Sequence, residues 1–355
     1  MSEWLESLSP WPEEFGLGRM RALLAALGEP QRAYPAIHVV GTNGKSTATR
    51  RSAAFLQREG IRAGAYTSPH VAGWSERIQV DGEDADLEPA LRRVRGPAER
   101  LGATQFEVLT AAALAEFAAA GVDVAVVEAG LGGRLDATNV LAAPVVALTN
   151  VALDHTQVLG DTREAIAAEK LAVVTPGATV VLGEPEWEPL ARGRGAGRIV
   201  RAQDVAPAAA EAFLGRPLGG EVEIDLPGRF DVVGEDVFAG AHNPAGVEWL
   251  VARLPRRDYV VVASMLADKD VDAMLQSLAR AGRILIATAS GSPRSLPAAE
   301  LARRGDRLFE AVEAVADPGQ ALARGRELAG AGGAVLVTGS LYLLADLNSA
   351  LQRIP

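Results

Sequence analysis

Short apolar runs alternate with helix-like stretches along most of the chain, and this alternation limits the possible folds more than any other feature. Residues 36–40, 123–130 and 143–150 are such runs, and the last two end in polar turns, as expected for strands buried in a parallel sheet. The stretches that start at Phe106 and Thr162 have the composition of helices. The alternation predicts an α/β fold with a layered sheet, in which ligands bind at the carboxyl ends of the strands.

The alternation comes in two series, which predict two domains. The length of 355 residues is more than one average domain needs. Residues 184–220 are rich in Gly, Pro, Ala and Arg and have weak periodicity, so we expect surface structure or a connector there. A second α/β series starts after residues 225–233. We place the boundary between residues 1–227 and a smaller, Rossmann-like domain at residues 228–355.

Composition and charge exclude several classes of function. The formal charge is −10, no basic block is present and 5 % of the residues are aromatic, so a nucleic-acid partner is not expected. The absence of cysteine excludes disulfides, thiolate metal sites and a cysteine nucleophile, and it fits a reducing compartment. The N-terminal residues do not resemble a secretory signal, and no stretch approaches the roughly 18 apolar residues of a membrane span. We expect a cytoplasmic protein that does not bind membranes and that acts on a small molecule.

Lysine is scarce in this chain. Of the 35 basic residues only Lys45, Lys170 and Lys269 are lysine, so the other 32 are arginine. A genomic preference for arginine explains the bias itself. Where arginine serves as well, arginine is already present, so each remaining lysine is expected where a compact amine is needed.

The sequence Gly41-Thr42-Asn43-Gly44-Lys45-Ser46-Thr47 lies between a predicted strand and a predicted helix. Its end matches a Walker A loop, in which backbone amides wrap phosphate oxygens, the lysine reaches the β and γ phosphates and the hydroxyl binds Mg²⁺. The first glycine of that motif is replaced by Val39, and a purely structural turn is the alternative. The flanking strand and helix favour a nucleotide site that uses Asn43, Gly44, Lys45, Ser46 and Thr47.

Three polar residues follow predicted strands and so belong to the same edge of the sheet. Glu128 follows an apolar run, His155 lies just beyond the run that ends at Asn150, and Ser68 follows another strand. With Ser46, these side chains suit a hard cation such as Mg²⁺. The structural alternatives are a helix-capping carboxylate for Glu128 and a turn histidine bonded to backbone for His155.

Longer motifs extend these observations over most of the chain. From about Trp4 to about Leu344 they occur in this order: GTNGKST, YTSPH, SERI, FEVLTAAAL, VVEAGLGGRLDATNV, LDHTQVLGDTREAIAAEK, LPGRF, GAHNPAG, MLADKD and VTGSLYL. The series resembles the folylpolyglutamate synthases and dihydrofolate synthases of the Mur ligase superfamily. The resemblance implies a P-loop-type parallel-sheet ATPase domain with the folate-side loops at residues 1–227. It also implies a Rossmann-like, glutamate-side domain at residues 228–355.

The resemblance implies an ATP-dependent amide ligase. ATP phosphorylates a carboxylate of the pterin or folate substrate, and the amino group of L-glutamate then attacks the acyl phosphate. ATP would be held by the loop residues and Arg229, and two Mg²⁺ ions by Ser46, Ser68, Glu128 and His155. Lys170 matches a lysine that the family carbamylates. The implied catalytic residues are Lys45, Lys170 and His242, and the implied substrate-binding residues are Arg77, Asp136, His242 and Ser340.

The chain also departs from the family pattern. The loop has Ser46-Thr47 where the family usually has Gly-Ser, Ala239 stands where an aspartate is usual, and the segment before Val205 is shortened. These departures leave the recognition of adenine open. They suggest one alternative, a nucleotide-binding homologue that has lost catalysis. A second alternative is a Mur-type ligase for a different carboxylic acid, because the family supplies no firm pterin pocket for residues 9–19. By analogy with the family we expect a monomer.

Overall fold

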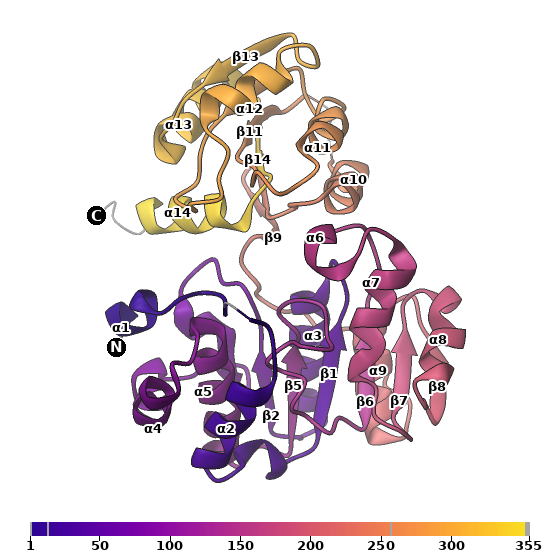
Figure 1. Ribbon diagram of the computed structural model, residues 1–355. Helices are drawn as coiled ribbons and strands as arrows, with labels where there is room; N and C mark the ends of the chain where they lie inside the picture. Colours follow the sequence, from indigo (N-terminus) through magenta and orange to yellow (C-terminus); the bar gives the residue numbers. More distant parts are fainter. Residues whose placement is uncertain (1, 13, 256–257, 352–355) are drawn as a thin grey trace. The chain divides into compact units, whose positions relative to one another are not determined.

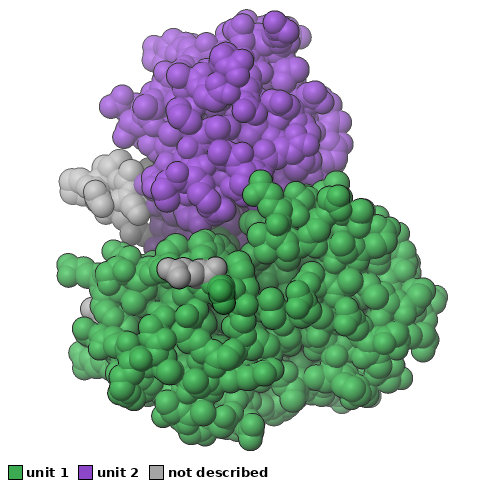
Figure 2. Space-filling view, in the orientation of Figure 1, with its two compact units in different colours: residues 1–69, 74–225 green, residues 70–73, 226–355 purple. Residues whose placement is uncertain are grey.

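The computed structural model describes residues 2–12, 14–255 and 258–351, and the chain forms two compact units (Figure 2). The first unit contains the residues up to 69 and residues 74–225, and the second contains residues 70–73 and those from 226 onward. The short segment 70–73 therefore belongs to the second unit although the first unit surrounds it in sequence. Both units are α/β structures, as the alternation predicted (Figure 1).

The first unit is built on an eight-stranded sheet with the order β4-β3-β2-β5-β1-β6-β7-β8. In this order, the six strands β2, β5, β1, β6, β7 and β8 pair in parallel. β3 and β4 add an antiparallel edge next to β2. β1 and β5, which lie at the centre, are buried along their whole length. The bounds are β1 Ala36–Val40, β2 Ala63–Tyr66, β3 Ile78–Val80, β4 Glu83–Asp84, β5 Val124–Glu128, β6 Val145–Leu148, β7 Thr179–Leu182 and β8 Arg198–Arg201.

Helices cover both faces of this sheet, which explains why its strands are apolar on both sides (Figure 1). Ile37 and Val39 of β1 face α3 and α9, whereas Ala36 and Val40 face the side of α2, α4 and α5. The helices of this unit are α1 Ser2–Ser7, α2 Gly18–Ala26, α3 Lys45–Arg58, α4 Leu87–Leu101, α5 Gln105–Ala120, α6 Thr156–Leu159, α7 Arg163–Lys170, α8 Glu188–Gly193 and α9 Val205–Leu214. Short 3-10 turns lie at Pro30–Arg32, Trp74–Arg77, Leu171–Val173 and Pro185–Trp187.

The prediction for residues 184–220 was wrong, because this region supplies a strand and a covering helix. β8 pairs with β7 at the edge of the sheet, and α9 is buried against α3. The Ser52 hydroxyl on α3 donates a hydrogen bond to the carbonyl of Ala206 on α9. An edge strand that carries arginine at both ends and an alanine-rich helix show little apolar periodicity, so the sequence hid both elements.

The second unit has a six-stranded sheet with the order β13-β12-β11-β14-β10-β9. Only β9, at one edge, pairs antiparallel with its neighbour among the described strands. α10, α11 and α12 pack on one face, and α13 and α14 pack on the other. The bounds are β9 Arg229–Val233, β10 Asp236–Ala239, α10 Pro244–Arg253, β11 Val260–Ala263, α11 Val271–Leu278, β12 Ile284–Ala287, α12 Ala298–Gly305, β13 Ala311–Ala314, α13 Pro318–Ala329, β14 Val335–Thr338 and α14 Leu341–Leu351.

Over the described residues, each helix is either too short or too polar to span a bilayer.

Candidate active site

The loop between β1 and α3 has the geometry of a phosphate-binding loop. Gly44 precedes the first residue of α3 in a left-handed conformation with φ 80°, and the amides of the first turn of α3 lie at the end of the helix that favours anions. Gly41 cannot be replaced by a larger residue without movement, since a Cβ there would lie 1.8 Å from the Thr149 hydroxyl oxygen. Gly41 therefore lets the loop backbone approach Thr149 closely, whereas Gly44 adopts the left-handed conformation that precedes α3.

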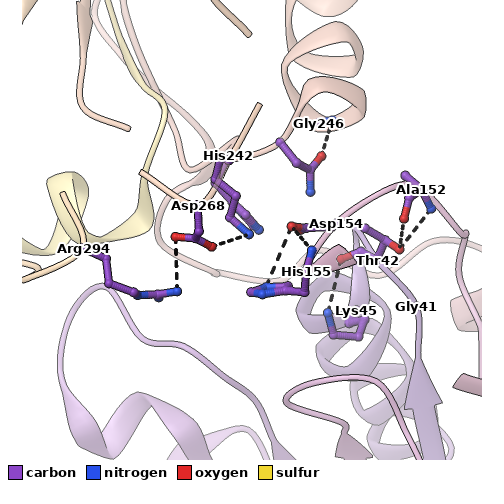
Figure 3. A network of polar contacts seen from close by, with 12 residues as sticks. Gly41, Thr42, Lys45, Ala152, Asp154, His155, His242, Gly246, Asp268 and Arg294 are labelled. Carbon is purple, nitrogen blue, oxygen red and sulfur yellow. Dashed lines mark hydrogen bonds and ion pairs between the residues drawn. The ribbon is translucent and has the colours of Figure 1, made fainter. Parts of the chain in front are cut away.

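The loop is held by residues that follow β6. The side-chain oxygen of Asn150 accepts from the Asn43 amide at 3.0 Å, and its side-chain nitrogen donates to the Asn43 carbonyl at 3.0 Å. The Thr42 amide donates to the Asn150 carbonyl, and the Thr42 hydroxyl accepts from the Ala152 amide at 3.1 Å (Figure 3). Asn150 was not among the site residues predicted from the sequence, although it anchors the loop. Its position just after a buried strand, next to the loop strand β1, is the signal that could have identified it.

Three of the predicted metal ligands meet at the end of β5. Glu128 is 1 % exposed, and its Oε1 accepts a hydrogen bond from the Ser46 hydroxyl at 3.1 Å. Its Oε2 accepts from the Ser68 amide at 3.0 Å, and Lys45 Nζ lies 4.0 Å from Oε1. The structure thus brings Lys45, Ser46, Ser68 and Glu128 together at the phosphate loop. Carboxylate and hydroxyl oxygens are the ligands that Mg²⁺ prefers, so the residues present fit such an ion.

His155 lies on the segment after β6 that also anchors the loop. It precedes α6 in a left-handed conformation with φ 49°, and its Nε2 is 3.9 Å from Asp154 Oδ1. Figure 3 shows Asp154 and His155 on the strand-end side of the loop, together with Thr42 and Lys45. Across the part of the chain that the structure describes, three or more His, Cys, Asp or Glu side chains nowhere gather as a metal cluster. Any cation here would therefore need hydroxyl or phosphate oxygens in addition.

Lys170, the last residue of α7, is buried beneath the loop. It is 4 % exposed, and its Nζ donates a hydrogen bond of 2.7 Å to the Gly41 carbonyl. The pKa of this amine is lowered to about 7, mainly by burial and also by the nearby charge of Lys45, while Asp154 and Asp136 oppose the shift. A large fraction of the amine is therefore neutral near pH 7, which is the form that reacts as a nucleophile.

A pocket of about 190 Å³ lies within the first unit, beside the loop that follows β5. One wall is aromatic and comes from Trp11, Phe15 and Phe106. Residues of the segment after β5 also line the pocket, namely Leu131, Arg134, Leu135, Asp136 and Ala137. The sequence analysis named no pocket for the N-terminal segment, yet Pro10, Trp11, Pro12, Phe15 and Gly16 line this one.

The structure engages Asp136 within its own loop. One carboxylate oxygen accepts from the Leu131 amide at 2.7 Å, and the other accepts from the amide and the hydroxyl of Thr138 at 3.0 and 2.5 Å. The carboxyl is 6 % exposed, and its burial raises the pKa while these donors and the Gly130 amide oppose the shift. Four donors match the lone-pair capacity of a carboxylate, so Asp136 shapes the pocket wall.

The other predicted substrate residue of this unit, Arg77, ends the 3-10 turn Trp74–Arg77. Its guanidinium lies over the Trp74 ring at 4.8 Å from the centroid, and its carbonyl accepts from the Thr67 amide. Arg77 directly precedes β3, and this bond holds it beside the residues that follow β2, which include Ser68.

Arg229, His242 and Ser340 belong to the second unit, where they lie near the ends of neighbouring strands. Arg229 opens β9, His242 follows β10, and Ser340 follows β14. His242 Nδ1 lies 2.8 Å from the Gly240 carbonyl, so it carries the proton and leaves Nε2 as the acceptor. Ser340 is 1 % exposed, and its hydroxyl oxygen accepts from the Tyr342 amide at the start of α14.

Lys269 follows β11, and its side chain is 4 % exposed. Its Nζ is 3.7 Å from Asp268, and the same carboxylate lies 3.5 Å from Arg294 (Figure 3). Lys45, Lys170 and Lys269 are thus all largely buried. Lys45 and Lys269 follow strand ends, and Lys170 lies beneath the phosphate loop.

Comparisons with known proteins agree with this geometry. Residues 228–341 match the family described as Mur ligase, glutamate ligase domain. A dihydrofolate synthase/folylpolyglutamate synthase of Mycobacterium tuberculosis is 33 % identical over 392 aligned positions, which cover 84 % of this chain and 80 % of that protein. The structure of Mycobacterium tuberculosis folylpolyglutamate synthase complexed with ADP has a TM-score of 0.91 at 30 % identity and covers 100 % of this chain and 98 % of that one. A bifunctional folylpolyglutamate synthase/dihydrofolate synthase with Mn, AMPPNP and L-glutamate bound has a TM-score of 0.86 at 29 % identity, with 99 % and 97 % covered.

Proposed function

This chain belongs to the dihydrofolate synthase/folylpolyglutamate synthase family and is an ATP-dependent ligase, and we propose that it joins L-glutamate to the carboxylate of dihydropteroate, of a folate, or of both. In the first step the substrate carboxylate takes the γ-phosphoryl group of ATP, which forms an acyl phosphate and ADP. The neutral amino group of glutamate then attacks the acyl carbon, phosphate leaves, and the amide is formed with release of a proton. The two steps need a phosphate-binding loop, a site for the acid and a site for glutamate.

The phosphate loop carries this proposal. Lys45 stands at the start of α3 beside the buried carboxylate of Glu128, and the backbone amides of the loop are free of bulky side chains at Gly44. A lysine at this place clamps the β and γ phosphates and stabilises the charge that moves during phosphoryl transfer. We assign ATP to Asn43, Gly44, Lys45, Ser46 and Thr47, and Arg229 of the second unit to the same nucleotide.

We propose that Ser46, Ser68, Glu128 and His155 hold Mg²⁺, with two ions in the loaded enzyme. The fit rests on the buried Glu128 carboxylate, whose two oxygens already converge with the Ser46 hydroxyl and the Ser68 backbone. A bound Mg²⁺ neutralises charge on the phosphoryl oxygens. Lys170 supplies a neutral amine, and we propose that this amine adds CO₂ and releases a proton, which turns the buried neutral amine into a carbamate anion next to the loop.

The pocket in the first unit is our candidate for the ring of the acid substrate. Its rings, Trp11, Phe15 and Phe106, offer flat apolar walls of the kind that stack on a planar heterocycle. Trp11 and Phe15 are each 43 % exposed with ring centroids 6.5 Å apart, so they have unburied area to offer a ligand. Asp136 holds the segment after β5 that also lines this pocket, and we place Arg77 on the substrate side of the same unit.

We assign the glutamate side to residues 228–355, with His242 and Ser340 as its contacts. Residues 228–341 match a glutamate ligase domain, which supports this division of labour. His242 donates from Nδ1 to the Gly240 carbonyl, so its Nε2 is the acceptor nitrogen and can take a proton from an ammonium group; the glutamate amine must lose a proton to become a nucleophile.

The test is phosphate release from ATP in the presence of L-glutamate, with dihydropteroate, tetrahydrofolate or no acceptor, and with the product identified by mass. We expect release that depends on both the acceptor and glutamate, and the better acceptor separates the two folate activities. Release that needs a different carboxylic acid instead would identify a Mur-type ligase for that acid. ATP binding without release for any acceptor would identify a homologue that has lost catalysis.

Three variants locate the chemistry. Lys45→Ala is expected to abolish turnover, whereas Arg58→Ala, which removes a positive charge from the other end of the same helix, is the matched control and leaves it within about twofold. Lys170→Ala is expected to impair turnover, with partial rescue by a short carboxylic acid in the buffer. Normal turnover of Lys45→Ala would refute the nucleotide site, and normal turnover of Lys170→Ala would show that this lysine only packs.

A further inference from the structure

A chain of hydrogen bonds connects the centre of the sheet with the wall of the pocket. His38 lies in the middle of β1, three residues before the phosphate loop, and it is fully buried. Its Nε2 is 2.8 Å from the hydroxyl of Thr138, which is also fully buried. The Thr138 hydroxyl in turn donates to Asp136 at 2.5 Å, and the same carboxylate accepts from the Leu131 amide.

The direction of these bonds fixes the form of the imidazole. Because the single proton of the Thr138 hydroxyl goes to the Asp136 carboxylate, the hydroxyl oxygen can only accept from His38. His38 therefore carries its proton on Nε2. Burial lowers the pKa of His38 to about 4, so the ring stays neutral at the pH of the cell and keeps one donor and one bare nitrogen.

The unpartnered Nδ1 means that packing alone does not explain a histidine at position 38. Among the described residues, no donor reaches its buried Nδ1. A buried polar atom without a partner is unfavourable, and an aliphatic side chain on this strand would avoid that penalty. The neighbours of His38 along β1, Ile37 and Val39, are of that aliphatic kind. Among the described contacts of His38, the hydrogen bond to Thr138 is thus the one that a hydrocarbon side chain could not make.

We propose that His38 is a positioning residue for the acid substrate, acting through Thr138 and Asp136 on the pocket wall that runs from Leu131 to Ala137. The inference rests on the proposed function of that pocket. Asp136 ties the two ends of this segment together, since it accepts from Leu131 at one end and from Thr138 at the other. His38 secures the Thr138 end to the strand that also carries the phosphate loop. The recognition of the acid and the position of the loop are thereby set by one strand.

Steady-state kinetics of four single variants and one double variant of the full chain test the proposal. His38→Leu and Thr138→Val remove the donor and the relay hydroxyl, and they are expected to raise KM for the pterin acid about tenfold, the effect of roughly one hydrogen bond, with KM for ATP within about twofold. Thr138→Ser keeps the hydroxyl, and His38→Gln keeps an N–H donor near the position of Nε2, so both are expected to stay near the wild-type values. The double variant His38→Leu/Thr138→Val is expected to be no worse than either single variant, because both break the same chain of bonds.

Hydrogen exchange gives a readout that does not depend on turnover. Thr138→Val is expected to speed amide exchange in the peptide that contains residues 131–138, and Thr138→Ser is not. Equal increases in KM for ATP and for the acid, or unchanged exchange in Thr138→Val, would overturn the positioning role. A wild-type enzyme that turns over no pterin acid would refute the proposed function instead. The exchange experiment would still decide whether the bonds from His38 through Thr138 to Asp136 hold residues 131–138 in place.

Discussion

Replacing Lys170 by methionine should make the ligand-free protein more stable at low pH. The pKa of the buried amine is about 7, compared with 10.5 for an ordinary lysine. At about 1.4 kcal/mol for each pH unit, this difference means that the charged amine destabilises the folded state by about 5 kcal/mol when it is protonated. Methionine has similar length and no charge, so it removes this term.

The variant also loses a favourable contact. The Gly41 carbonyl no longer receives the 2.7 Å bond from Nζ, which costs about 2 kcal/mol for a buried acceptor. The net gain at pH 6 is therefore about 3 kcal/mol. In wild type the folded state releases its proton near pH 7 and the unfolded chain only near 10.5, so wild-type stability rises between these values and the gain of the variant disappears.

Calorimetry of metal-free, CO₂-free protein at pH 6, 8 and 10 measures this effect. A gain of about 3 kcal/mol corresponds to a melting temperature raised by roughly 6–12 °C at pH 6 for a unit of this size, and the sign should reverse near pH 10. Lys269→Met is the matched control, because Lys269 is equally buried but has Asp268 as a partner, so its removal should lower stability at pH 6. A Lys170→Met protein that is less stable than wild type at pH 6 would refute the reasoning.

Three further predictions concern the loop, the cation site and the second unit. Gly41→Ala should abolish ATP binding because its Cβ clashes with Thr149, whereas Gly44→Ala has open space around it and should weaken ATP binding only about tenfold because of its positive φ. Calorimetric titration measures both affinities, and an equal loss in the two variants would contradict the assigned clash. Glu128→Gln should lower kcat at least about tenfold and raise the Mg²⁺ concentration needed for half-maximal rate, and an unchanged Mg²⁺ dependence would exclude the carboxylate as a ligand. Ala239→Asp should lower the melting temperature with ATP affinity unchanged, because Ala239 is 3 % exposed within an apolar cluster; tighter ATP binding would show that the side chain reaches the nucleotide.

The alternation of the sequence predicted the central elements of both sheets. β1, β5 and β6 lie within the predicted runs because strands buried on both faces are continuously apolar. The helix predicted after the phosphate loop is α3, which starts at Lys45 and ends at Arg58. Local composition is sufficient for such elements, since their burial is uniform along their length.

Elements at the edges of the sheets could not be predicted in the same way. β4 has two exposed residues, and β13 is at most half-buried, so neither produces an apolar run. α9 lacks periodicity because small alanines pack closely against α3, and a Gly-Pro-Ala-rich stretch looks like a connector until its partner is known. These elements depend on tertiary contacts that a single sequence does not display.

The same limit applies to the site. The loop, Glu128 and Lys170 carry their chemistry in residue type and spacing, so the sequence indicated them. Asn150 and Thr138 act through hydrogen bonds to Asn43 and His38, which are at least 100 positions away in the sequence, and residue type alone does not mark that role. Supporting residues become visible only when the fold places their partners beside them.

The energetics of Lys170 bear on whether this chain has kept its activity. A buried amine that opposes folding by about 5 kcal/mol when protonated consumes a large part of the stability of an ordinary domain. Methionine or leucine would fill the same space without that term, and arginine would suit a chain in which 32 of 35 basic residues are already arginine. Neither arginine nor an apolar residue can present a neutral primary amine 2.7 Å from the Gly41 carbonyl. A residue that opposes folding and has this one chemical capacity is expected in a working site, and it argues against a homologue that only binds nucleotide.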